Sequence, residues 1–182
     1  NDKMWSLNKE RKGWLRLHSL PAKQLLWAKN SLTQRAIGPV SYTSVKLDAS
    51  KLKAGDEAGL GAINMPYASL GVVKTDKGLA LRCYDQNTNK EVLKPIAKNK
   101  VIWLRLWGDY DKSLLQYSYS LDGKTWENIG EQMLSPYQLK TFQGVRVALY
   151  AFNKTGVNGG VADFDDFKVE EPMADRTANL PI

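Results

Sequence analysis

The chain has 182 residues, 43% of them hydrophobic, and a formal net charge of +7 at pH 7. This length suits one domain with a substantial core, and the hydrophobic content is too high for a disordered chain. No apolar run approaches the roughly 20 residues of a membrane-spanning helix. The basic residues are dispersed, without a run of about five like charges, so we expect a solvated basic surface and no nucleic-acid partner. Weak attraction to acidic polysaccharide stays open.

The chain contains one cysteine, Cys83, and one histidine, His18. A single thiol excludes an internal disulfide and a cysteine-based zinc cage. We expect Cys83 to be a packed strand residue and His18 to have a surface or structural role at a strand end. The composition therefore argues against Ser-His-Asp, Cys-His and multi-histidine metal centres within the chain.

Short runs typical of β-strands recur along the whole chain, separated by clusters rich in Gly, Asn, Asp and Lys. The runs are 14–17, 40–47, 58–64, 69–74, 79–84, 101–107, 114–121, 145–152 and 161–169. This rhythm predicts an all-β, antiparallel two-sheet jelly-roll sandwich over residues 1–171, followed by a C-terminal tail at 172–182. Only residues 22–29 have helix-like composition, and we expect a single turn of helix or a strand lead-in there.

The stretch 117–126 gives the strongest local signal. Alternating residues run into Asp122-Gly123, and an apolar run restarts at once, which predicts a hairpin because Asp and Gly tolerate the backbone angles of tight turns. We expect Trp126, which follows this turn, and Phe164, in a later strand, to be buried anchors of their strands.

Alternation within residues 101–107 assigns two faces to this strand. Ile102, Leu104 and Leu106 form a core set. The alternate residues Trp103, Arg105 and Trp107 therefore lie on the opposite face of the strand. Aromatic rings about 7 Å apart with a cation between them suit a sugar platform. Our candidate ligand-binding residues are Trp103, Arg105, Trp107 and Tyr110. The alternative is that Trp103 packs under a loop.

Acidic residues cluster at 163–166, directly after Gly159-Gly160. Asp163 and Asp165 share a face at the start of a strand. Carboxylate and carbonyl oxygens suit calcium, so these two residues are candidate ligands of a structural calcium ion. The alternative is a hydrogen-bonded acid at a β-bulge. Phe164 and Phe167, three residues apart, reach the same core only if such a bulge intervenes.

Several blocks of sequence, taken in their order along the chain, carry a family resemblance. The blocks are 14–17, 28–35, 38–39, 56–60, 67–72, 103–106, 117–123 and 159–165. In this order they resemble the C-terminal concanavalin A-like β-sandwich of family forty-three glycoside hydrolases, which are β-xylosidases, α-arabinofuranosidases and related enzymes of plant polysaccharide. The resemblance covers about residues 5–170.

The resemblance implies that catalysis belongs to a separate five-bladed propeller domain with three acidic residues. The sandwich would be a non-catalytic accessory module that packs on that domain, holds plant polysaccharide or oligosaccharide, or does both. The family also implies a secreted, periplasmic or cell-surface location. No signal peptide is visible, and the first residue is Asn1 rather than Met, so we expect a processed chain or a fragment.

Two other functions stay open: a free-standing glycosidase or lyase on this fold, and a lectin-like extracellular protein. A glycosidase needs two carboxylates facing a cleft. Glycosidases of this fold usually carry a Glu-x-Asp-x-x-Glu strand, which does not occur in this sequence. We therefore expect no catalytic residues in this chain.

Overall fold

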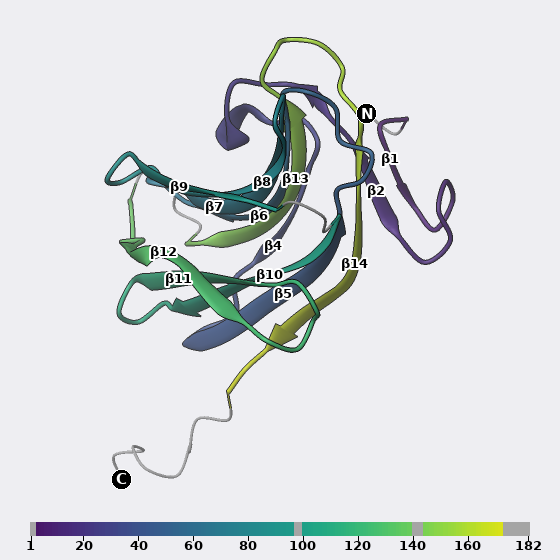
Figure 1. The fold of residues 1–182 in the computed structure, drawn as a ribbon. Coiled ribbons are helices and arrows are strands. Elements are labelled where there is room, and N and C mark those ends of the chain that lie inside the picture. Colours follow the sequence, from purple (N-terminus) through teal and green to yellow (C-terminus); the bar gives the residue numbers. More distant parts are fainter. Residues whose placement is uncertain (1–2, 97–99, 140–143, 173–182) are drawn as a thin grey trace, which may run out of the picture.

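A computed structural model describes residues 3–96, 100–139 and 144–172. Two sheets pack face to face, and each contains seven strands within the described residues (Figure 1). The first sheet runs in the order β1 (Trp5–Leu7), β2 (Leu15–His18), β14 (Val161–Glu170), β5 (Val40–Asp48), β10 (Val101–Asp109), β11 (Leu114–Ser120) and β12 (Glu127–Leu134). The second runs β3 (Leu20–Pro21), β13 (Arg146–Asn153), β6 (Asp56–Ile63), β7 (Ala68–Thr75), β8 (Gly78–Asp85) and β9 (Lys90–Pro95), with β4 (Ser31–Arg35) also paired to β13.

Strand pairing is antiparallel except between the two-residue strand β3 and β13. The jelly-roll sandwich predicted from the sequence is therefore confirmed. One turn of 3-10 helix, η1 (Leu25–Trp27), forms in the segment with helix-like composition. The described residues contain no helix long and apolar enough to cross a membrane. The tail at 173–182 lies outside the described residues.

The main core fills the space between the sheets, as the alternation predicts. Ile102, Leu104 and Leu106 of β10 are fully buried there, and so are Leu60 and Leu70 of the second sheet. Burying such a side chain contributes roughly 1.5–3 kcal/mol relative to leaving it exposed, so this layer is the main source of stability. Cys83 belongs to the same cluster, which confirms that it is a packed strand residue, and burial raises the pKa of its thiol to about 12.

A second, smaller core lies on the outer side of the second sheet. Leu25 of η1 packs there against Tyr150 and Phe152 of β13 and against Tyr67, which precedes β7. The chain before β4 thus covers part of this face. The outer face of an antiparallel sheet usually faces water. Where a chain segment covers only part of such a face, a cavity can form between the segment and the sheet.

The hairpin between β11 and β12 forms around Asp122-Gly123, with six residues between the strands. Gly123 has φ +73°, and one Asp122 carboxylate oxygen accepts hydrogen bonds from the backbone N–H groups of Lys124 (2.8 Å) and Thr125 (2.7 Å). These bonds hold the pKa of Asp122 below its usual range. The turn is therefore stabilised by the Asp side chain, as is typical of Asx turns.

The outcomes for the two predicted anchors differ. Phe164 is 2% exposed and lies in the main core, as predicted. Trp126 is only half-buried and lies on the outer face of the first sheet, so its predicted burial is wrong. The long turn is the reason, because Trp126 precedes β12 instead of beginning it.

Candidate functional site

The outer face of the first sheet carries the aromatic residues predicted from the alternation of β10. Trp103, Arg105 and Trp107 are all half-buried, between fully buried neighbours. Their cross-strand partners on β5 are Lys46, Ser44 and Tyr42, respectively. We call the group Tyr42, Lys46, Trp103, Arg105, Trp107 and Trp126 the aromatic face.

Arg105 is held between two rings at the centre of the aromatic face. Its guanidinium carbon lies 4.1 Å from the ring centroid of Trp126 and 5.3 Å from that of Tyr42. Its Nε donates a hydrogen bond to Ser118 Oγ at 3.0 Å, and burial lowers its pKa from the usual value. Cation–π pairs of this kind fix the orientation of the rings. The face is therefore a preorganised platform, and much of Arg105 is used to build it.

Trp103 and Trp107 differ in what covers them. A Cβ atom added at Gly123 would lie 2.9 Å from the Trp103 ring, so the turn between β11 and β12 packs directly over that ring. This agrees with the alternative in which Trp103 packs under a loop. Trp107 is flanked in register by Tyr42 and Gln116. We therefore regard Trp107 as the better candidate for ligand contact.

Tyr110 is not part of this face. It follows β10, packs against the main core, and its ring contacts the backbone at Gly38 and Gly108. Burial raises the pKa of its hydroxyl. Grouping Tyr110 with the aromatic face was wrong, because its even position places it on the core side of the alternation.

The carboxylate of Asp163 is occupied by arginines. It is 2% exposed, and it accepts hydrogen bonds from Arg16 Nε (2.7 Å), Arg16 Nη2 (2.9 Å) and Arg11 Nη1 (2.8 Å). Burial alone would raise the pKa of Asp163, but these hydrogen bonds and charges outweigh it and the pKa lies below the usual value. Arg11 also bonds Asp48 at 2.7 Å, so one arginine bridges two carboxylates.

The residues near Asp163 and Asp165 do not fit a calcium ion. Two guanidinium groups already balance Asp163, and a cation there would have to displace them. Asp165 is separated from Lys168 by a shift in strand register, with Asp166 at φ +53°. A β-bulge is therefore present, as in the alternative reading. Among the described residues, no group of three His, Cys, Asp or Glu side chains is arranged to hold a metal.

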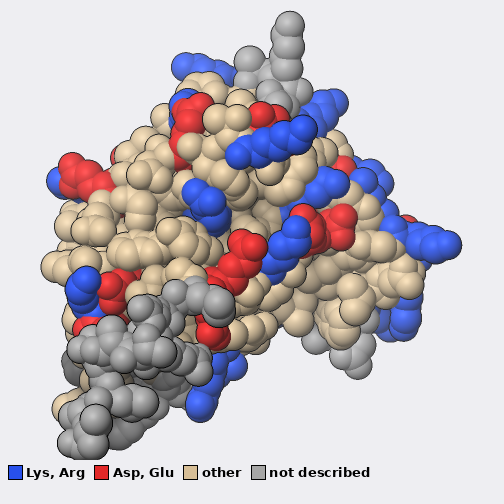
Figure 2. Space-filling view, turned by 90° about the horizontal axis from the view of Figure 1, so that it is seen from below, with Lys and Arg blue, Asp and Glu red and all other residues tan. Residues whose placement is uncertain are grey.

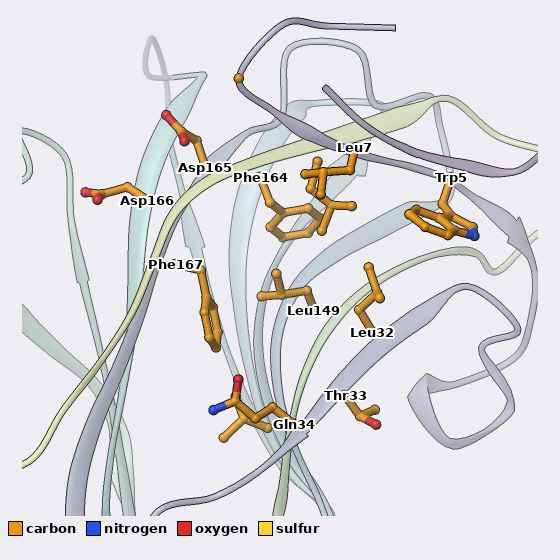
Figure 3. Close-up of a pocket in the computed structure, with 13 residues that line it drawn as sticks. Trp5, Leu7, Leu32, Thr33, Gln34, Leu149, Phe164, Asp165, Asp166 and Phe167 are labelled. Atoms are coloured by element: carbon orange, nitrogen blue, oxygen red, sulfur yellow. The ribbon is translucent and has the colours of Figure 1, made fainter. Parts of the chain in front are cut away.

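The bulge leaves Phe167 outside the core, beside an apolar groove of about 560 Å³ at the edge of the sandwich (Figure 3). Trp5 and Leu7 of β1 form one wall, and Leu32 of β4 lies opposite. Asp165 carries its carboxylate at the rim, away from the other labelled side chains (Figure 3). Asp165 and Asp166 are the two carboxylates of the groove lining.

Three large apolar side chains, each more than half exposed, gather at one end of the sandwich. They are Trp27, Met65 and Tyr137, and we call them the end patch. Trp27 and Met65 line one hollow of about 450 Å³, and Tyr137 lines a second of about 210 Å³. Asn64 lines both hollows and donates hydrogen bonds to Ser135 and Pro136, so the two hollows adjoin.

Sequence reasoning missed a polar cavity over the second sheet, built around Glu57 of β6. Glu57 is 1% exposed and pairs with Arg82 of β8 (3.3 Å) and with Lys154 (2.6 Å). The signal was present in the alternation of residues 57–61, where Glu57, Gly59 and Gly61 share a face opposite the core residues Ala58 and Leu60. A glutamate inside a buried strand needs charged partners, and those come from distant segments.

The fold and these surfaces define a class, the concanavalin A-like β-sandwich. The sequence profile of the family described as "Beta xylosidase C-terminal Concanavalin A-like domain" (GH43_C2) matches residues 1–170. The chain therefore belongs to this family of C-terminal domains of family-43 glycoside hydrolases. The resemblance and the fold class inferred from the sequence are thereby confirmed.

Individual relatives agree with this assignment. A solved structure of a bifunctional GH43-CE protein of Bacteroides eggerthii superposes with a TM-score of 0.87 at 34% identity, over 96% of this chain and 23% of that chain. The structure of xylan beta-1,4-xylosidase from Bacillus halodurans C-125 gives 0.76 at 19% identity, over 94% and 35%. A protein of Xylanibacter ruminicola named "Putative beta-xylosidase" is 27% identical over 71% of this chain. The chain spans 23% of the length of that curated relative.

Proposed function

We propose that this domain serves a larger glycoside hydrolase as an accessory module, packing against its catalytic domain through the end patch. The family is one of C-terminal domains, and the chain spans 23% and 35% of the two solved GH43 structures named above. A propeller domain of the kind implied by the family resemblance is the partner that we propose. The substrate of the whole protein would be a plant polysaccharide such as xylan, in line with the names of the relatives.

The observation that carries the docking proposal is the exposure of the end patch. Trp27 and Tyr137 are the most exposed aromatic side chains among the described residues. Large aromatic side chains are enriched in the buried centres of protein interfaces, and contiguous exposed apolar surface marks such sites. The two adjoining hollows beside these side chains could receive protruding side chains of the partner domain, as close packing requires.

The test uses the full-length protein that contains this domain. Replacing Trp27 and Tyr137 together by Ser should separate one unfolding transition into two and expose the domain junction to limited proteolysis. The same double variant of the isolated domain should keep its melting temperature, because both side chains are exposed.

The matched control is Leu7→Ser, which changes an exposed apolar side chain of the edge groove. We expect this variant to unfold like the wild-type full-length protein. If Leu7→Ser separates the transitions and the end-patch variant does not, the catalytic domain docks at the edge groove and the proposed surface is wrong.

Glycan contact through the aromatic face is a second proposal, supported by the preorganised rings around Arg105. Stacking on an aromatic ring is favourable for the apolar faces of a sugar, and Trp107 is the ring best placed for it. Because polymeric substrates lie outside the cell, we also propose that the whole protein is secreted, periplasmic or on the cell surface. A leader peptide in its gene would support that location.

A further inference from the structure

The outer face of the second sheet carries glycine at the centre of its two middle strands. Strand register places Tyr150 of β13, Gly59 of β6, Gly71 of β7 and Arg82 of β8 in one row across the sheet. Glu57 lies two residues before Gly59 on β6 and therefore on the same face of the sheet. Because both central strands carry glycine in this row, the Tyr150 side chain can lie across them: a Cβ atom added at Gly71 would be 2.5 Å from the Tyr150 hydroxyl, which donates a hydrogen bond to Glu57 Oε1 at 3.0 Å.

A cavity of about 140 Å³ lies beside Glu57 and Arg82, and the chain segment that leads into η1 forms part of its wall. Lys23 comes from that segment, and Lys154 comes from the loop after β13. The cavity is much smaller than the roughly 300 Å³ or more of drug-sized pockets, so its volume suits one sugar residue and not a chain of them.

Cations outnumber carboxylates in the cavity wall. The lining contains Lys23, Arg82 and Lys154, but only one carboxylate, that of Glu57. A second carboxylate, Glu91, bonds Arg82 Nε from outside the lining at 2.7 Å. The resulting excess of positive charge favours an anionic ligand.

Hydrogen-bond donors remain after these ion pairs are made. Arg82 uses Nη1 for Glu57 and Nε for Glu91, and its Nη2 donates no hydrogen bond within the described residues. Lys154 Nζ contacts Glu57 Oε2 at 2.6 Å, which uses one of its three N–H groups. Arg82 and Lys154 both contact Glu57 Oε2, so their charged groups lie close together, and such a pair suits a carboxylate, which accepts two hydrogen bonds.

Neutral hydroxyl groups and aromatic rings complete the wall. Ser69 is 1% exposed, and its hydroxyl lies beside that of Tyr150 without a well-formed hydrogen bond to any described group. A buried hydroxyl without a partner is costly, and a ligand hydroxyl would supply the partner. Tyr67 and Tyr84 form an aromatic wall, with ring centroids 5.5 Å apart.

We propose that this cavity binds one carboxylated sugar residue, a hexuronate, with its carboxylate on Arg82 and Lys154 and a hydroxyl group on Ser69. The wall of Tyr67 and Tyr84 contacts the apolar edge of the sugar ring. This site lies on the second sheet, opposite the aromatic face, and does not depend on docking at the end patch.

The test is calorimetric titration of the domain with D-glucuronate, D-glucose and acetate at equal pH and ionic strength. Glucuronate should bind about tenfold or more tightly than either of the others, because only it offers both the charge and the hydroxyl groups. Acetate tests whether the site binds any carboxylate: if acetate binds as tightly as glucuronate, the site recognises the charge and not the sugar. A uronic-acid-substituted oligosaccharide then distinguishes a terminal sugar on a polymer from the free acid.

Three variants locate the binding. Lys154→Gln should weaken glucuronate binding about tenfold or more, and Lys112→Gln, an exposed lysine on the β10–β11 turn, should leave it unchanged. Ser69→Ala should weaken binding without lowering the melting temperature, because it removes a hydroxyl that lacks a partner in the free protein.

Four results would overturn the proposal: no detectable glucuronate binding, equal affinity for glucose, equal affinity for acetate, or unchanged affinity in both Lys154→Gln and Ser69→Ala. Since Lys154 is partly exposed and Ser69 has no partner to lose, neither substitution should prevent folding. The measurement therefore stays interpretable whatever the role of the end patch.

Discussion

The guanidinium of Arg105 lies over the indole ring of Trp126, 4.1 Å from the ring centroid. The two residues come from β10 and from the turn that precedes β12, so the contact ties that turn to the outer face of the first sheet. It explains why Trp126 is half-buried on this face and not in the core. The stability of the domain should therefore depend far less on Trp126 than on Phe164.

Phe164→Ala should lower the free energy of unfolding by about 3–5 kcal/mol, because the ring is 2% exposed and its loss leaves a cavity in the main core. Trp126→Ala should cost only about 1–2 kcal/mol, the value of a cation–π contact and partial burial. Urea denaturation of both variants gives the comparison. Equal losses for the two variants would contradict the placement of Trp126.

Asp163→Asn should destabilise the domain by about 3 kcal/mol at pH 7, because it leaves Arg16 and part of Arg11 without their buried partner. The folded-state pKa of Asp163 lies below its unfolded value, so ionised Asp163 stabilises the native state above the unfolded pKa of about 3.9. That contribution is lost as the pH falls through the lower, folded-state pKa.

The stability curves of wild type and Asp163→Asn should therefore converge in acid and diverge toward neutral pH. Denaturation at a series of pH values measures this. Asp76→Asn, in the exposed turn between β7 and β8, is the matched control and should follow the wild-type curve. A constant difference between Asp163→Asn and wild type at all pH values would argue against the ion pairs as its cause.

Melting curves recorded in saturating calcium and in chelator should coincide. The arginines around Asp163 already balance its charge, so we expect no calcium binding there and no stabilisation of the folded state by calcium. A melting temperature that rises with calcium, and no longer does so in Asp165→Ala, would instead support the calcium site inferred from the sequence.

If the aromatic face binds glycan, Trp107→Ala should weaken retention of the domain in affinity gels containing xylan or arabinoxylan. Loss of one stacking contact predicts a change of about tenfold in affinity. Lys112→Gln serves as a control away from the rings. Should Trp107→Ala bind as wild type does, the face is not the binding site, and binding to neither glycan would leave domain docking as the better account.

The isolated domain should release no nitrophenol from xyloside, arabinofuranoside or glucoside substrates. Asp48 and Asp163, two carboxylates that approach each other, are bridged by Arg11 and so cannot act as a free acid and base. Turnover that disappears on substitution of one acid in this chain would refute the non-catalytic assignment.

The two-sheet fold and most of its core could be predicted from the sequence, because alternation is a local property of each strand. The prediction that Ile102, Leu104 and Leu106 face the core needed only the period of two. The strands β1, β3, β4 and β9 were missed. The first two are only three and two residues long, and β4 and β9 are largely exposed and give no alternating apolar signal. The hairpin at Asp122-Gly123 could also be predicted from local sequence, but the length of its turn could not.

The positions of the polar groups depended on the tertiary structure. Asp163 meets Arg16 because β14 pairs with β2, although the two residues are 147 positions apart in the sequence. This contact makes Asp163 part of an ion pair instead of a metal site. Glu57 meets Arg82 and Lys154 because β6 lies between β7 and β13. Apolar burial has no direction and follows from the pattern of one strand, whereas hydrogen bonds and ion pairs require particular atoms from distant segments to meet. The sequence alone thus determined which faces are buried, and only the packing of the strands decided which charges face one another.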